Sequence, residues 1–121
     1  MSRSLDDLSS RFRPLVDELL QQAAAAGIEV RIIDTLRTPA EQEANVAKGV
    51  SWTLRSKHLP GPEGKAEAID IAPISVLGLK AWAPRHADWQ RLGLIGENLG
   101  LRWGGRWIKT PDLAHFEYLE K

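Results

Sequence analysis

Asp70 interrupts an apolar run near the middle of the chain. Residues 66–72 read AEAIDIA, and Asp70 stands there between two isoleucines. β-Branched residues on both sides predict a strand, and a carboxylate buried in it without a partner would cost several kcal/mol. The fold must therefore bring a compensating group to Asp70. Two kinds are available: a metal ion shared with histidines, or a structural ion pair with Arg37 or Arg102.

The composition limits what the rest of the chain can supply. Its 121 residues suffice for one compact core, so we expect a single domain over residues 1–121. The 16 Lys and Arg residues balance the 16 Asp and Glu residues, and this zero net charge argues against a nucleic-acid partner or an anionic membrane. Because the chain has no Cys, any metal ligands must be His and carboxylate side chains.

Periodicity and turn residues predict alternating helices and strands. Ser9 and Ser10 are available as caps of a first helix, and Thr38 with Glu41 predicts a capping box at a second. The order of these elements predicts a small α+β domain, with a short antiparallel sheet flanked by helices. We expect helices over residues 10–26, 38–49 and 84–99, and strands over 28–35, 66–72 and 115–119.

Two of the three histidines occupy junctions between a loop and a strand. His58 lies in the Gly- and Pro-rich loop at 50–65, just before the Asp70 strand, and His115 begins the last strand. At such junctions a rigid sheet can aim loop side chains at a shared point. With Asp70 they would form the set of two His and one carboxylate that catalytic zinc uses. His86, at a predicted helix start, is expected to be an ordinary surface residue.

Asp112 and Arg37 could take part in the same chemistry. Asp112 precedes His115 by three residues, close enough to share its pocket and exchange protons with a zinc-activated water and a leaving amine. Its alternative is an ordinary turn residue. Arg37 follows the first strand, where it could hold a substrate carboxylate or a polarised carbonyl. Its alternative is an ion pair with Asp34 or Glu41.

Several short motifs occur along the chain. They are SRSLDDL at 2–8, LRT-x3-Q at 36–42, SKH at 56–58, AIDI at 68–71, WGGRW at 103–107 and DLAHFE at 112–117. Together they resemble the zinc peptidases that cut bacterial cell-wall peptides, which include D-alanyl-D-alanine carboxypeptidases and the L-alanyl-D-glutamate endopeptidases of phage endolysins. The resemblance runs from residue 2 to residue 120 and implies the same Hedgehog/D-Ala-D-Ala peptidase-like fold.

The resemblance implies a role for each matching residue. Zn²⁺ is expected on three ligands, next to a carboxylate acid/base and an arginine that stabilises the scissile carbonyl or a substrate carboxylate. We also expect one indole of the WGGRW segment to line the substrate cleft. The ligands are His58, Asp70 and His115, the catalytic residues Asp112 and Arg37, and the substrate-binding residues Ser56, Gln42 and Trp103.

The sequence departs from the family pattern at three places. The family commonly has His-x-x-Gly-x-Ala-x-Asp, whereas His58 and Asp70 are farther apart here because of an inserted segment at 60–64. A loop can bulge outward without moving its ends, so we expect both ligands to survive. Ala114 replaces a common proline. Arg106 replaces a frequent acidic residue, which could alter substrate preference.

The implied function is hydrolysis of peptidoglycan stem peptides at the L-alanyl-D-glutamate bond by a phage or prophage endolysin. The alternatives are D-alanyl-D-alanine carboxypeptidase activity and an inactive, zinc-containing binding domain of the Hedgehog type. Asp112 favours an enzyme, because a binding domain needs no acid/base. No signal peptide or membrane-spanning stretch is visible. We therefore expect a monomer made in the cytoplasm that reaches the wall through a holin-type pore.

Overall fold

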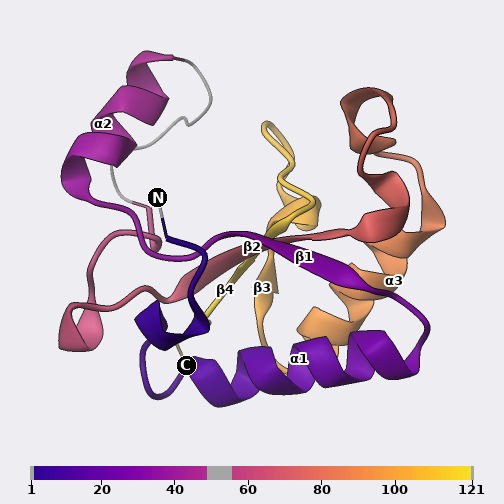
Figure 1. Cartoon of the computed structure of the whole chain (residues 1–121), viewed down its shortest axis with the longest axis horizontal. Coiled ribbons are helices and arrows are strands. Elements are labelled where there is room, and N and C mark those ends of the chain that lie inside the picture. The colour runs from indigo at the N-terminus through magenta and orange to yellow at the C-terminus, as the bar shows by residue number, and fades with distance from the viewer. Residues whose placement is uncertain (1, 49–55, 121) are drawn as a thin grey trace.

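The computed structural model describes residues 2–48 and 56–120 (Figure 1). Its centre is an antiparallel sheet of four strands in the order β1-β2-β4-β3. Two helices pack against this sheet, while α2 stands apart from it at one end (Figure 1). The predicted α+β fold is confirmed. The elements are α1 (Arg13–Ala25), β1 (Val30–Asp34), α2 (Pro39–Ala47), β2 (Ala68–Pro73), α3 (Ala87–Asn98), β3 (Arg102–Trp103) and β4 (His115–Glu117).

Strand alternation separates the core from a polar face. Ile69 and Ile71 of β2 are fully buried in one cluster with Phe116 of β4 and the apolar sides of α1 and α3. Successive side chains of a strand point to opposite faces of the sheet. Asp70 therefore points away from this cluster, and so does His115, its antiparallel partner on β4. The register places the two polar side chains next to each other.

The start of α1 differs from the prediction. The helix begins at Arg13, and no side chain caps it. The Ser9 hydroxyl donates instead to Glu67, at 2.7 Å, and Ser10 donates to Glu63. Both partners lie more than 50 positions along the chain, so tertiary hydrogen bonds have displaced the local caps.

The start of α2 follows its sequence signal, whereas α3 begins at Ala87, three residues after the predicted start at residue 84. Thr38 and Glu41 form the predicted capping box of α2, and this helix ends at Ala47, while the predicted end near residue 49 lies outside the described residues. His86 caps α3 through Nδ1, which accepts a hydrogen bond from the backbone of Asp88 at 3.0 Å. His86 thus has a structural role and lies outside the cluster of other histidines.

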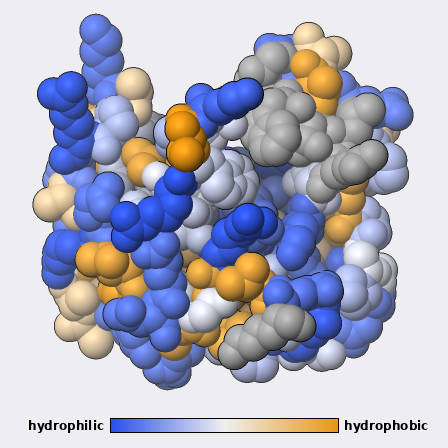
Figure 2. Space-filling view, turned by 180° about the vertical axis from the view of Figure 1, so that it is seen from behind, coloured by the Kyte–Doolittle hydropathy of each residue, from blue (hydrophilic) through white to orange (hydrophobic). Residues whose placement is uncertain are grey.

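The surface seen from behind is mostly hydrophilic (Figure 2). Apolar side chains on this face gather in small groups among charged ones. Within the described residues, no helix combines the length and apolar character needed to cross a bilayer.

Candidate metal centre

His58, Asp70 and His115 meet on the polar face of the sheet. Their ligand atoms all lie within 4.8 Å of one another. His58 Nε2 and His115 Nδ1 lie 3.1 and 3.2 Å from the same oxygen, Oδ1 of Asp70. Two imidazole nitrogens and a carboxylate oxygen aimed at one point form a donor set that suits zinc. The three residues predicted as ligands could therefore hold a metal ion together.

Each histidine ring is oriented by its outer nitrogen. His58 Nδ1 lies 2.6 Å from the carbonyl oxygen of Thr35, and His115 Nε2 lies 2.7 Å from Oε1 of Glu117. Such bonds place the proton on the outer nitrogen and leave the inner one free to bind a metal. Glu117 was not predicted in this role. The available signal was its position two residues after His115, on the same face of a strand.

The electrostatics of the cluster favour an added positive charge. Although burial opposes ionisation of both groups, the two histidines lower the pKa of Asp70, and Asp70 with Glu117 raises the pKa of His115 to about 9. The carboxylates thus hold a proton on His115 well above its usual titration range. A metal ion would satisfy the same carboxylates in its place, so the residues present fit a zinc ion.

The inserted segment at 60–64 leaves His58 in place. It is exposed and folds outward as predicted, closed by a hydrogen bond from the Gly61 backbone to Lys65 at 2.9 Å. Before this segment, the Ser56 hydroxyl accepts a hydrogen bond from the backbone N–H of His58 at 3.1 Å. The carbonyl of His58 in turn accepts from the backbone of Arg37 at 2.8 Å. These bonds fix the end of the loop from which His58 projects.

The Arg37 side chain forms one of the ion pairs weighed for it and also reaches the candidate centre. Its Nε donates to Asp34, and its Nη1 donates to Oε1 of Gln42 at 2.7 Å. The remaining Nη2 lies 3.4 Å from Oδ2 of Asp70. The ion pair with Asp34 therefore exists, and it directs the guanidinium toward the candidate centre. Gln42 is only 1% exposed, so it supports Arg37 from below the surface.

Asp112 lies on a tightly packed turn beside the ligands. Its backbone N–H donates to the Gly104 carbonyl at 2.9 Å, and its carbonyl accepts from the backbone of His115 at 3.2 Å. A Cβ atom at Gly104 would lie 2.6 Å from the Asp112 carbonyl, so a larger residue would displace the turn. Burial raises the pKa of Asp112, and the charge of Asp70 adds to this effect. A carboxyl group of raised pKa suits proton exchange near neutral pH.

The two indoles of the WGGRW segment have different positions. Trp103 is 1% exposed, and its Nε1 donates to the Leu113 carbonyl at 2.9 Å. This burial is a correction to its expected place in the cleft wall: α3 approaches so closely at Gly93 that the indole fills the core. Trp107 lies nearer the candidate centre, with its ring centroid 5.0 Å from that of His115.

Known proteins resemble this chain in sequence. The family model described as D-alanyl-D-alanine carboxypeptidase matches residues 49–118. The L-alanyl-D-glutamate peptidase of Listeria phage A118 is 32% identical over 120 residues, and the match covers 97% of this chain. The chain spans 41% of the length of that curated relative.

Solved structures share the fold. The L-Ala D-Glu endopeptidase ChiX of Serratia marcescens superposes with a TM-score of 0.73 at 22% identity, covering 98% of this chain and 87% of its own. The LD-carboxypeptidase LdcB gives 0.62 at 16% identity, with 98% and 63% covered. The vancomycin resistance D,D-pentapeptidase VanY, solved with Zn(II), gives 0.61 at 17% identity, with 92% and 72% covered. The family model covers more than half of the sequence, and the chain belongs to the D-alanyl-D-alanine carboxypeptidase family.

Proposed function

We propose that this chain is a zinc-dependent peptidase that hydrolyses the L-alanyl-D-glutamate bond of peptidoglycan stem peptides, within one domain over residues 1–121. The observation that carries the proposal is the convergence of His58, Asp70 and His115 beside the Asp112 turn. Family membership supports the peptidase chemistry. The choice of bond is supported by the phage L-alanyl-D-glutamate peptidase, which is similar over nearly the whole chain.

The ion would be held by His58 Nε2, Asp70 and His115 Nδ1. When bound, zinc supplies a Lewis acid that polarises a carbonyl and lowers the pKa of a bound water to about 7. Thr35 and Glu117 keep the two imidazole rings facing the ion. The protein's part in metal binding is therefore to fix two tautomers and one carboxylate in advance.

Asp112 acts as the acid/base in this proposal. Its carboxylate removes a proton from the attacking water and returns it to the nitrogen of the departing amine. Burial and the charge of Asp70 raise the pKa of Asp112, which favours uptake of the proton by its carboxylate. Trp103 assists from the core by holding the adjacent Leu113 carbonyl.

Arg37 stabilises the negative charge that develops on the scissile carbonyl, or holds a carboxylate of the substrate. Asp34 and Gln42 occupy Nε and Nη1, so Nη2 is the group directed toward the centre. Stabilisation of this kind contributes about 3 kcal/mol in well-studied hydrolases. Ser56 lines the substrate site while its hydroxyl holds His58 in place.

The phage relative also supports a role as an endolysin that acts on the cell wall. A holin-type pore would then deliver it from the cytoplasm as a monomer. Co-expression with and without such a pore tests this role: lysis that requires both proteins supports it, and lysis by this chain alone contradicts it.

The products formed from purified peptidoglycan test the proposed activity. The zinc-loaded protein is incubated with peptidoglycan, with and without chelator, and new ends are identified by mass spectrometry. New D-glutamate amino ends that chelator abolishes support the proposal. Release of terminal D-alanine would favour the second candidate, the D-alanyl-D-alanine carboxypeptidase activity that names the family. Bound zinc without cleavage would indicate an inactive binding domain.

A further inference from the structure

Three consecutive residues other than glycine adopt a left-handed backbone between β2 and α3. The angle φ is 52° at Ala81, 56° at Trp82 and 44° at Ala83. The side chain of an L-residue strains the backbone in this region, and a bulky residue there is a clear outlier. Such strain persists only where surrounding contacts hold it, and it concentrates at functional sites. The turn at 81–83 is therefore held by its surrounding contacts, and these contacts determine which side chains it exposes.

The contacts that hold this turn leave an indole partly open. The Trp82 carbonyl accepts from Nε1 of Trp89 at 2.8 Å, and the two rings stack with centroids 6.4 Å apart at 25°. Backbone bonds from Trp82 to Leu79 and from Ala83 to Lys80 close the turn, both at 3.0 Å. Trp89 is 1% exposed and Trp82 is 36% exposed. The Trp82 ring thus rests on a buried indole and keeps surface open to solvent.

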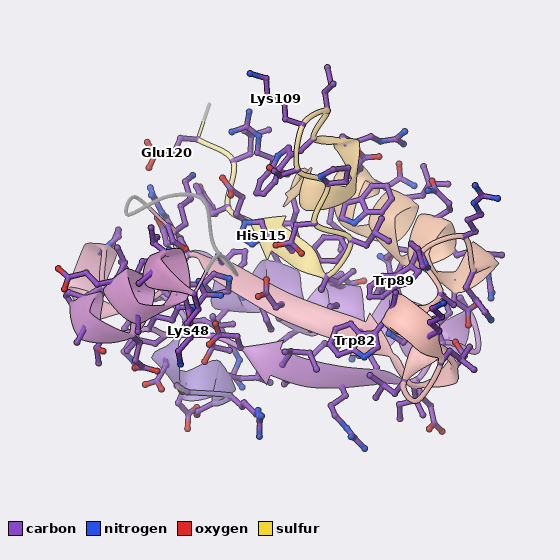
Figure 3. All side chains as sticks on the ribbon, turned by 90° about the horizontal axis from the view of Figure 1, so that it is seen from above. Lys48, Trp82, Trp89, Lys109, His115 and Glu120 are labelled. Atoms are coloured by element: carbon purple, nitrogen blue, oxygen red, sulfur yellow. The ribbon has the colours of Figure 1, made fainter. Side chains whose placement is uncertain are left out.

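Trp82 borders the face that carries the candidate metal centre. Trp89 packs in a small buried cluster with Val76 and Ala114, and Ala114 directly precedes His115. The segment 74–86 rises on the same side of the sheet as α2 and the 104–113 loop (Figure 1). Seen from above, His115 lies behind Lys48 and Trp82, and along the long axis its position falls between theirs (Figure 3). Trp89 therefore stacks on Trp82 and shares a buried cluster with Ala114, which belongs to the Asp112–His115 turn.

The surroundings of Trp82 combine apolar surface with cations. Leu79 is 48% exposed, and Lys80 and Arg85 are exposed on the same short segment. An indole with aliphatic surface beside it suits the apolar face of a sugar ring, and nearby cations suit its polar substituents and attached carboxylates. The patch is small and broken by charge, unlike the large apolar area of a stable protein interface. Its chemistry favours a carbohydrate.

We propose that Trp82 forms a subsite for the sugar of the glycan strand that carries the stem peptide. This inference rests on the proposed function. In peptidoglycan the first L-alanine is joined to a lactyl group on the sugar, so a single residue separates the sugar from an L-alanyl-D-glutamate bond. One residue spans at most about 3.6 Å. An enzyme cutting this bond must therefore accommodate the sugar beside its catalytic centre, whereas one cutting the terminal D-alanine bond need not.

The test compares two substrates that differ only in the sugar. The ratio kcat/KM is measured on a disaccharide-tetrapeptide and on the same tetrapeptide with an acetylated amino end. Trp82→Ala lowers it about five- to tenfold on the sugar-linked substrate and less than about twofold on the acetylated peptide. Trp82→Phe keeps most of the activity on both. Leu94→Ala is the control: it truncates a half-exposed apolar residue on α3 and leaves kcat/KM unchanged on both substrates.

Two results would overturn the subsite. Equal losses on both substrates would show that Trp82 supports the fold of the centre, and unchanged cleavage of the sugar-linked substrate would show that the ring is idle. Should Trp82→Ala fail to fold, Trp82→Leu keeps an apolar contact with Trp89 but lacks the aromatic face, and the same losses are expected.

A binding experiment separates failure of the subsite from failure of the proposed function. If the wild-type protein cleaves neither substrate, the proposed function fails. Retention on glycan strands freed of their peptides still tests Trp82. Retention that is lost in Trp82→Ala and kept in Leu94→Ala supports the subsite, and equal retention of all three proteins contradicts it.

Discussion

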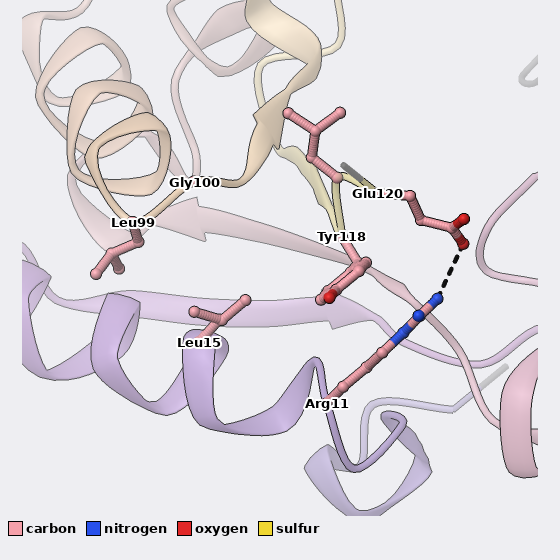
Figure 4. Close-up of a pocket in the computed structure, with 7 residues that line it drawn as sticks. Arg11, Leu15, Leu99, Gly100, Tyr118 and Glu120 are labelled. Carbon is pink, nitrogen blue, oxygen red and sulfur yellow. Dashed lines mark hydrogen bonds and ion pairs between the residues drawn. The ribbon is translucent and has the colours of Figure 1, made fainter.

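Two regions of the molecule carry clustered charge, and they are built differently. Near the C-terminal end, Arg11 donates to both carboxylate oxygens of Glu67 at 2.7 Å and to Glu120 at 2.9 Å, and its guanidinium lies over the ring of Tyr118 (Figure 4). A pocket of about 450 Å³ opens beside this group. Because these charges satisfy one another, the group is complete without a ligand.

At the candidate metal centre two histidine side chains converge on one carboxylate. His58 and His115 face the same oxygen of Asp70, and each is held from behind by a group that orients its ring. Asp112 adds a further carboxylate nearby. The comparison teaches that clustering of charge does not by itself mark a functional site. The candidate centre differs from the Arg11 group in two ways. Its side chains point at one shared position, and the outer nitrogen of each histidine is held by another residue.

The largest effect is expected from removing a ligand. His58→Ala leaves only two of the three candidate metal donors, so hydrolysis of peptidoglycan peptides should fall to the background rate. His86→Ala is the matched control, because His86 caps α3 outside the cluster and should leave turnover unchanged. If His58→Ala keeps its turnover, the candidate metal centre is not needed for hydrolysis. The functional distinction between this centre and the Arg11 group would then be wrong.

Asp112→Asn should separate proton transfer from metal binding. The amide keeps the shape of the turn but cannot accept the proton, so kcat falls by about 10²–10⁴-fold. Zinc content and the unfolding midpoint stay at wild-type values, measured on the same preparation. A parallel loss of zinc would show that Asp112 is a ligand and that the assignment of the donor set is wrong.

Two matched glutamate variants sharpen the comparison between the regions. Glu117→Gln weakens the group that orients His115 and should reduce zinc affinity by about 10–100-fold, measured by competition with a chelator. Glu67→Gln changes a carboxylate of similar burial in the Arg11 group and should leave zinc affinity unchanged. If both variants reduced zinc affinity equally, Glu117 would not act by orienting His115.

The smallest expected effect concerns the pH dependence of stability. The hydrogen bond with Arg11 lowers the pKa of Glu67 below the ordinary value of 4.5. A lowered folded-state pKa gives stability that is fully present above the unfolded pKa and is lost as the pH falls through the folded-state value. The free energy of unfolding of metal-free protein should therefore fall below about pH 5, and Glu67→Gln should make this fall smaller. Denaturant titrations from pH 7 to pH 3 measure the free energy of unfolding of both proteins. If it falls equally at low pH in the wild type and in Glu67→Gln, the Arg11–Glu67 pair contributes nothing to the pH dependence of stability.

Local signals predicted most of the fold. The capping box at Thr38, the apolar periodicity of the helices and the β-branched runs all lie within a few residues of the elements they define. The alternation along β2 places Asp70 on the face of the sheet opposite its flanking isoleucines. The predicted caps at Ser9 and Ser10 failed because their hydroxyls bind glutamates distant in sequence.

The ligand residues could be proposed from sequence, but their support could not. Glu117 matters only because β4 turns its side chain toward the same face as His115. The burial of Trp103 depends on Gly93 in another element. The left-handed turn at Trp82 has no glycine or asparagine to announce it, since it is held by stacking on Trp89. Each of these features arises from tertiary contacts that no local pattern contains.

X-ray absorption by the zinc-loaded chain tests the central claim most directly. The account predicts about one zinc ion per chain with two imidazole nitrogens among its nearest neighbours. His115→Ala should retain at most one of these nitrogens, while His86→Ala should give the wild-type spectrum. A spectrum with fewer than two imidazoles in the wild type, or one that His115→Ala leaves unchanged, would show that His58, Asp70 and His115 are not the metal centre.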